Sequence, residues 1–138
     1  MNPIKLAVVA FAATFGLAAV ASADDAAGKL PPASTKQGVT YTADIKPVLD
    51  TSCVKCHSGD KPRAKLKLDT LENILKGSQD GKVIIAGDSA KSPLVLSAAH
   101  LTDDPDLWMP PKKFQAKFPP LTPDRIGLIR AWIDQGAK

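Results

Sequence analysis

Two cysteines and a histidine in the middle of the chain have a spacing suited to holding a prosthetic group. Cys53 and Cys56 are the only cysteines, and His57 follows the second one directly. Cysteines three positions apart lie on one face of a helical turn, so both sulfurs can form thioethers to the vinyl-derived carbons on one edge of a porphyrin. The next residue then carries a ring nitrogen over the macrocycle toward the iron. The C-x-x-C-H spacing therefore predicts one haem c, bound covalently through Cys53 and Cys56 and ligated by His57.

Other chemistry for the same residues has less support. A redox dithiol of the thioredoxin type occurs beside a βαβ pattern, which this sequence lacks. A zinc site would have to combine the two cysteines with His57 and His100, the only histidines. Adjacent Cys56 and His57 do not easily share one tetrahedral centre. Two cysteines also exclude an all-cysteine zinc site and an iron–sulfur cluster held by four cysteines of this chain.

The second axial ligand of a haem iron has two main candidates, Met109 and His100. Met109 lies in residues 107–111, a loop stiffened by two prolines. A stiff loop suits a thioether ligand because the iron–sulfur bond is weak, and a methionine beside prolines is a poor core residue. His100 falls near the end of a predicted helix, where a histidine can simply complement the helix dipole or meet solvent. We expect Met109 to be the ligand, with His100, a deprotonated lysine and an open distal position as alternatives.

Trp108 directly precedes the candidate methionine and is predicted to contact the cofactor. Its indole N–H could donate a hydrogen bond to a haem propionate, or its ring could pack against the porphyrin edge. On either interpretation Trp108 belongs to the haem-binding residues.

The first 23 residues have the features of a secretory signal peptide. Lys5 gives a positive start, residues 6–20 form a mostly apolar run of 15, and Ala21, Ser22 and Ala23 fit an A-x-A cleavage site. The run is short for a membrane span, which needs about 20 residues, and this favours a cleaved signal peptide. The alternative is an uncleaved N-terminal anchor. Haem c is attached outside the cytoplasm, which agrees with export. We therefore expect a periplasmic protein.

Four stretches have the apolar spacing of short helices that would position these residues. They lie at about residues 41–57, 69–77, 92–100 and 122–136. Thr42 and Asp69 are the predicted N-caps of the first two, and a proline in the first turn favours the starts of the last two. Residues 83–85 are the only plausible strand. The fold class is therefore predicted to be all-α, with long connections rich in proline and glycine.

The ordered domain is expected at residues 41–138. Residues 24–40 contain glycines and prolines without apolar periodicity, which predicts a flexible leader. A domain of under about 100 residues buries little surface and is marginal unless something else fills its core. Aromatic residues make up only 5% of the chain, so few large side chains are available to fill the core. A large apolar cofactor at the centre would relieve it.

Short motifs are distributed along nearly all of residues 41–138. They are YTADIKP at 41–47, CVKCH at 53–57, LKLD at 66–69, ILKG at 74–77, AGD at 86–88, SPL at 92–94, MPP at 109–111 and IRAWIDQGA at 129–137. In this combination the chain resembles the planctomycete-type cytochrome c domain, a branch of the class I cytochrome c superfamily. C-x-x-C-H is common to c-type cytochromes, so the resemblance depends most on the M-P-P and W-I-x-x-G-A segments. Ala86 stands where that pattern usually has proline.

The resemblance implies a class I cytochrome c-like fold, with about four short helices wrapped around one covalently bound haem. It also implies His57 and Met109 as axial ligands, and single-electron transfer between redox partners rather than enzymatic catalysis. The alternative function is a haem c subunit with an open or bis-histidine iron, acting in peroxidase-type catalysis or gas sensing. A peroxidase would need a distal acid–base residue, for which His100 is the one histidine left. A dithiol module without haem is the third hypothesis.

Basic residues flank the ligand-bearing positions. Residues 55–67 carry five lysines or arginines against one aspartate, and Lys112, Lys113 and Lys117 follow Met109. A basic rim around the haem edge would steer an acidic redox partner toward it. A net charge of +4 and a pI of 9.1 are too mild to indicate nucleic acid, for which no motif is present. We expect a soluble monomer that docks on redox proteins, including membrane complexes.

Overall fold

The computed structural model describes residues 29–138, which form an all-α fold. Its α-helices within that range are α2 (Lys46–Ser52), α3 (Leu71–Lys76), α4 (Pro93–Ala98) and α5 (Pro123–Asp134). A π-helical turn precedes α2, and short 3₁₀-helical turns lie between the helices. The described residues contain no strand, and residues 83–85, where a strand was plausible, are irregular. The predicted fold class is confirmed.

The first two helical segments begin at threonines one or two positions away from the predicted caps. Thr40, rather than Thr42, caps the π-helical turn η1 (Tyr41–Ile45), because its hydroxyl accepts a hydrogen bond from the N–H three residues on at 3.3 Å. Thr70, rather than Asp69, caps α3 in the same way at 3.1 Å. Threonine and aspartate side chains can both satisfy a free helical N–H, so neighbouring candidates compete and the sequence pattern alone does not separate them.

The predicted starts of the last two helices are confirmed. Ser92 and Thr122 are the N-caps, and each is followed by a proline at the first helical position. Gly77 ends α3, as expected, with φ at +90°. A β-carbon at this glycine would lie 2.4 Å from the carbonyl oxygen of Gly81, so the turn after α3 has room only for glycine.

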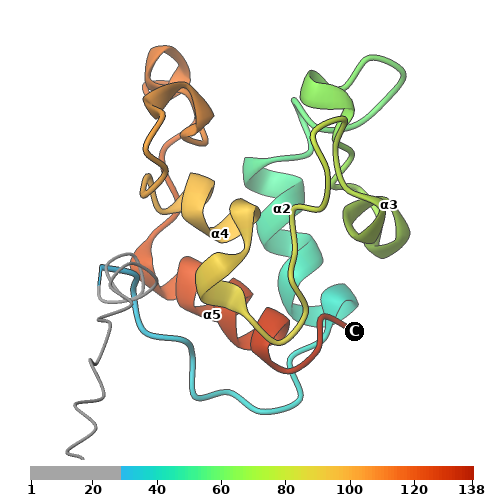
Figure 1. The fold of residues 1–138 in the computed structure, drawn as a ribbon, viewed down its shortest axis with the longest axis vertical. Helices are drawn as coiled ribbons and strands as arrows, with labels where there is room; N and C mark the ends of the chain where they lie inside the picture. The colour runs from blue at the N-terminus through green and yellow to red at the C-terminus, as the bar shows by residue number, and fades with distance from the viewer. Residues whose placement is uncertain (1–28) are drawn as a thin grey trace, which may run out of the picture.

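The core is built around α5, which packs against α4 and η1 (Figure 1). Its buried residues include Ile129, Trp132 and Ile133. Leu49 of α2 and Val95 of α4 are each only 1% exposed and complete the same cluster. The cluster is mostly aliphatic, with Tyr41 and Trp132 as its aromatic members, and it extends into residues 53–82 through Leu68 and Ile74. Two loop-rich segments, residues 53–82 and 101–121, project together from the helical base (Figure 1).

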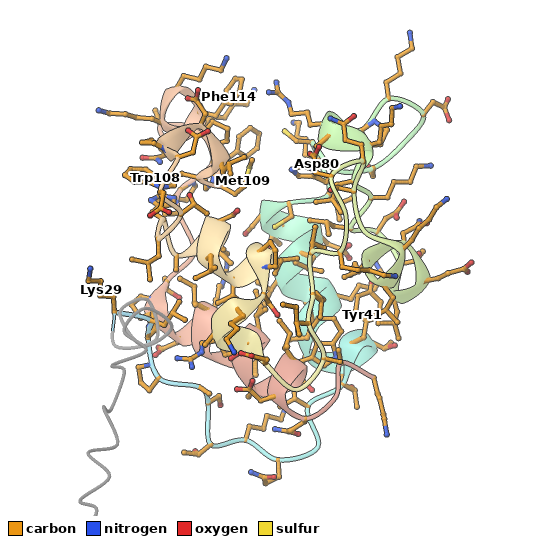
Figure 2. All side chains as sticks on the ribbon, viewed as in Figure 1. Lys29, Tyr41, Asp80, Trp108, Met109 and Phe114 are labelled. Carbon is orange, nitrogen blue, oxygen red and sulfur yellow. The ribbon has the colours of Figure 1, made fainter. Side chains whose placement is uncertain are left out.

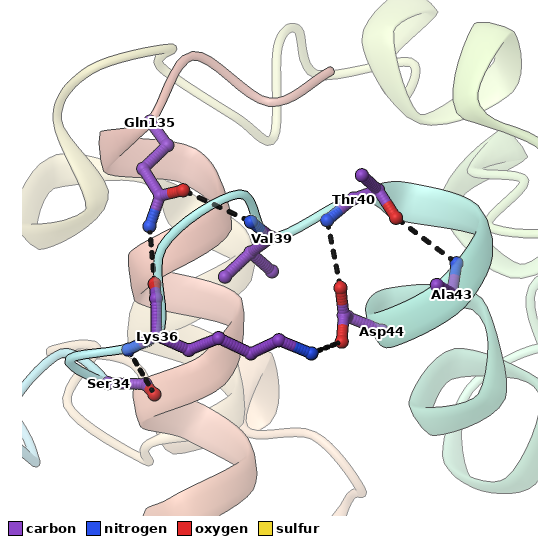
Figure 3. A network of polar contacts seen from close by, with 7 residues as sticks. All are labelled: Ser34, Lys36, Val39, Thr40, Ala43, Asp44 and Gln135. Atoms are coloured by element: carbon purple, nitrogen blue, oxygen red, sulfur yellow. Dashed lines mark hydrogen bonds and ion pairs between the residues drawn. The ribbon is translucent and has the colours of Figure 1, made fainter.

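Residues 29–40 differ from the prediction of a flexible leader, because they pack along α5. Leu30 and Val39 are buried, and the Ser34 N–H donates to the carbonyl of Gly127 at 2.9 Å. The side chain of Gln135 accepts from the Val39 N–H at 3.1 Å and donates to the Lys36 carbonyl at 2.8 Å (Figure 3). The segment lacks periodicity because it lies extended and satisfies its backbone with groups of α5.

The packed part of the chain therefore starts by Leu30 rather than at Tyr41. The predicted signal peptide at residues 1–23, and residues 24–28 of the predicted leader, lie outside the described residues. Within residues 29–138, every helix is too short or too polar to cross a membrane.

Candidate functional site

A cavity of about 280 Å³ lies between the two projecting segments, which we call the cysteine lobe (residues 53–82) and the methionine lobe (residues 101–121). Figure 2 shows Met109 and Phe114 on the methionine lobe and Asp80 on the cysteine lobe, on opposite sides of this space. The walls are mostly apolar, and α4 and α5 form the floor. The apolar lining includes Leu49, Leu66, Leu68, Val83, Leu94, Leu107, Phe114, Phe118, Leu121 and Ile129.

The predicted haem-attachment residues line this cavity together. Cys53, Cys56 and His57 are all on its wall, and Met109 reaches it from the other lobe. The end of α2 sets their positions: the Cys53 N–H still donates to the helix, while the Cys56 and His57 N–H groups both donate to the Cys53 carbonyl at 3.1 and 3.0 Å. This tight turn puts the two thiols and the imidazole on one side of the chain. Both cysteines are free thiols.

The environment of Cys53 disfavours redox dithiol chemistry. Burial raises the pKa of the Cys53 thiol to about 11, with a smaller contribution from Cys56. Thiol–disulfide exchange depends on a thiolate, and the reactive cysteine of such enzymes has a lowered pKa. The described residues also include no group of three or more histidine, cysteine or acidic side chains arranged to hold a metal ion. The dithiol and zinc interpretations therefore gain no support from the geometry.

His57 is held as a neutral imidazole beside the thiols. Its residue is 6% exposed, and burial is the largest cause of a lowered pKa, which the carbonyls of Leu66 and Arg63 partly oppose. The Nδ1 atom of the ring is buried without a hydrogen-bond partner. The Leu68 N–H donates to the His57 carbonyl at 2.8 Å and fixes the backbone. A neutral histidine is the form that ligates iron.

The methionine loop is held by hydrogen bonds to α4 and to its own lobe. The Met109 N–H donates to the Ser97 carbonyl at 3.0 Å, and a ring nitrogen of His100 lies 3.2 Å from the Met109 carbonyl oxygen. The Pro110 carbonyl accepts from the side-chain amide of Gln115 at 3.1 Å. The loop is thus fixed at several backbone atoms.

His100 and Trp108 lie behind the cavity wall and not in it. Their rings stack, with centroids 5.1 Å apart and planes at 5°. The indole N–H of Trp108 donates to the Thr102 carbonyl at 3.3 Å. The prediction that Trp108 contacts the cofactor therefore gains no support, because its donor is satisfied within its own lobe. The His100 ring is likewise engaged with its lobe, which disfavours His100 as the second axial ligand.

Two phenylalanines at the cavity mouth escaped the sequence analysis. Phe114 and Phe118 both line the cavity. The Arg63 guanidinium lies 5.0 Å from the centre of the Phe114 ring, and the Lys55 ammonium 5.6 Å from that of Phe118. Both are cation–π contacts between the two lobes. The sequence did offer one signal for them: the two phenylalanines are four residues apart, within a lysine-rich stretch at residues 112–118.

These residues fit a haem. An apolar cavity with two free thiols, a neutral histidine and a methionine loop on its walls is the arrangement of a c-type cytochrome domain. Residues 53–113 match the family described as Planctomycete cytochrome C, which confirms the resemblance seen in the sequence. The matched stretch runs from the first cysteine past the methionine loop and ends before α5. Comparisons with curated proteins and with solved structures each found no match.

The family supports haem c as the cofactor and electron transfer as the general role. Cytochrome c domains are generally electron carriers, and the C-x-x-C-H turn at Cys53 and Cys56 fits the thioether attachment that defines haem c.

Proposed function

We propose that this chain is a periplasmic monohaem cytochrome c that carries single electrons between redox proteins, with His57 and Met109 as the axial ligands. The observation that carries the proposal is that Cys53, Cys56, His57 and Met109, from two lobes far apart in sequence, line one apolar cavity. A haem bound there supplies an iron centre that changes charge by one. Two cysteine thioethers would hold it, and one histidine and one methionine would keep its coordination the same in both charge states.

The residues of the cavity favour the reduced state. Methionine ligation raises the reduction potential of a haem, and apolar surroundings disfavour the additional positive charge of the oxidised form. The cavity walls are predominantly aliphatic and aromatic. These features support a carrier with a comparatively high potential.

The basic rim supports an acidic redox partner. Arg63 and Lys55 of the cysteine lobe, with Lys113 and Lys117 of the methionine lobe, all contact the phenylalanines at the cavity mouth. Their charges therefore lie near the edge of the cavity, where a redox partner would approach the haem. Steering by such a surface depends on salt. Periplasmic location rests on the sequence of residues 1–23.

The deciding experiment is optical spectroscopy of the full chain made in cells that attach haem c. We expect a mass increased by one haem, a low-spin spectrum in both oxidation states and a methionine-to-iron charge-transfer band in the ferric state. High-spin iron that readily binds carbon monoxide would instead support the enzyme or sensor alternative. Colourless protein of unmodified mass would support the dithiol module.

The variant Met109→Ala tests the second ligand. The charge-transfer band should vanish, and the reduction potential should fall by on the order of 0.1 V or more, because axial ligands tune haem potentials over a range of ~0.8 V. His100→Ala tests the other candidate ligand, because a methionine-to-iron charge-transfer band that persists in this variant, even if weakened, excludes His100 as the ligand. An unchanged potential in Met109→Ala would contradict the ligand assignment.

A further inference from the structure

A second histidine lies directly behind the candidate methionine ligand. The Nε2 atom of His100 is 3.2 Å from the carbonyl oxygen of Met109. The same ring stacks on Trp108, whose indole N–H donates to the Thr102 carbonyl. The stack therefore forms a support behind the loop, tied to the main chain at both ends.

We propose that His100 is a positioning residue for Met109, and that it acts through a hydrogen bond from its Nε2–H to the Met109 carbonyl. A carbonyl oxygen can only accept, so the contact requires that Nε2 carry the proton. The inference rests on the proposed function, because positioning matters only if the Met109 sulfur ligates the iron.

Both polar main-chain atoms of Met109 are then held by the last turn of α4 and by His100, two residues beyond its end. The N–H donates to the Ser97 carbonyl at 3.0 Å, and the carbonyl accepts from His100. Fixing both atoms fixes the peptide planes on either side of the α-carbon, and hence the direction in which the side chain leaves the backbone. A weak iron–sulfur bond depends on that direction more than a strong bond would.

The backbone at His100 points to the same role. Its φ of +57° lies in the left-handed region, where non-glycine residues are uncommon. The turn that ends α4 there is closed by the Leu101 N–H, which donates to the Leu96 carbonyl at 2.9 Å. Glycine is the usual residue at such a position. A histidine there carries its ring to the back of the methionine loop, where a glycine would leave the carbonyl without this donor.

Two substitutions separate the hydrogen bond from the stacking. His100→Gln keeps a side-chain N–H donor and loses the ring, whereas His100→Phe keeps a ring for Trp108 and loses the donor. Both residues meet the same positive φ, so the backbone cost is matched. In the ferric protein, we expect His100→Phe to weaken the charge-transfer band and to bind added imidazole in place of methionine about fivefold more tightly, the factor for one neutral hydrogen bond. His100→Gln should stay close to the wild type.

Nitrogen-15 NMR of the ferrous wild-type protein supplies a second readout, because low-spin ferrous haem is diamagnetic. The His100 ring should show its proton on Nε2. Thermal unfolding of each variant reports general loss of structure, which should be equal for the two substitutions.

Each outcome bears on one of the two proposals. If His100→Phe binds imidazole as the wild type does, or if the proton lies on Nδ1 alone, the positioning role is wrong although the ligand assignment stands. If both variants lose the band equally, a side-chain donor at this position is not enough to hold the loop, and the positioning proposal is also overturned. A wild-type protein without the methionine band, unchanged by Met109→Ala, would instead refute the proposed function and this inference with it.

Discussion

Main-chain hydrogen bonds position the residues that are suited to bind a haem. The Cys56 and His57 N–H groups share one acceptor, the Cys53 carbonyl, so the attachment turn does not depend on side chains elsewhere. Met109 is likewise anchored through its backbone, to Ser97 and His100. The side chains of Cys56, His57 and Met109 are therefore free to bind a cofactor, because the turn and the loop are held by their main-chain atoms.

Gly77 is the residue at which the smallest change should have the largest structural effect. A β-carbon there would clash with the Gly81 carbonyl, and φ is +90°. Gly77→Ala should reduce the free energy of unfolding by about 2–3 kcal/mol, since it adds a steric overlap to backbone strain. Chemical denaturation of the holoprotein measures this.

Gly59→Ala is the matched control for Gly77→Ala. Gly59 also has a positive φ, of +74°, but a β-carbon there meets nothing within 4 Å. The cost should be about 1 kcal/mol, from the left-handed conformation alone. Equal losses in the two variants would show that the turn after α3 tolerates a side chain.

Gly77→Ala should also alter the haem spectrum, because residues near that turn, Asp80 and Lys82 among them, line the cavity and would shift with it.

At the scale of elements, α5 organises the fold and binds the extended segment 29–40. Gly127 allows the close approach, because a β-carbon there would lie 2.5 Å from the Pro32 carbonyl oxygen. Helix propensity by itself favours alanine over glycine by about 1 kcal/mol in a helix interior. The glycine in the middle of α5 is therefore explained by the segment that crosses it, and not by the helix.

Gly127→Ala tests whether the segment packs on α5 in solution. If it does, the variant should be destabilised by about 1–3 kcal/mol despite the better helix former, because overpacking forces the segment to move. Arg125→Ala, at an exposed position of the same helix, should change stability by less than about 0.5 kcal/mol. Thermal and denaturant unfolding report both. Stabilisation of Gly127→Ala by about 1 kcal/mol would mean that residues 29–40 do not pack there.

At the scale of the whole molecule, two lobes meet at one cavity and carry positive charge around its mouth. The cation–π pairs of Arg63 with Phe114 and of Lys55 with Phe118 connect the lobes. The mostly aliphatic core is built around α5 and extends into the cysteine lobe at Leu68 and Ile74. A haem between the lobes would add the apolar contacts that a chain with so few aromatic residues otherwise lacks.

The charge around the mouth should control the rate of electron transfer to an anionic partner. We expect the double variant Lys113→Gln and Lys117→Gln to slow oxidation of the ferrous protein by hexacyanoferrate(III) by about threefold or more at low salt. The difference should shrink above about 0.5 M salt, where charges are screened over a few ångströms. Stopped-flow absorbance at several ionic strengths measures it.

Lys29→Gln with Lys91→Gln is the control for that experiment, because it removes the same net charge from residues that make no cation–π contact with Phe114 or Phe118. Its rate should stay nearer to that of the wild type. Equal slowing in both double variants would show that only net charge matters and that the rim has no directing role.

Local patterns in the sequence determined the helices, their proline starts and the C-x-x-C-H turn. All of these depend on interactions between residues a few positions apart, so spacing alone predicts them. Caps were misplaced by one or two positions at Thr40 and Thr70, since neighbouring polar residues compete for the same N–H groups.

Only the tertiary structure decided which residues meet from distant parts of the chain. It brought Met109 to the cavity with His57, whereas Trp108 is not among the lining residues and its indole N–H donates to the Thr102 carbonyl. It also packed residues 29–40 against α5, where Gly127 has no β-carbon to block their approach. These outcomes depend on shape complementarity between segments, which no periodicity along the chain encodes.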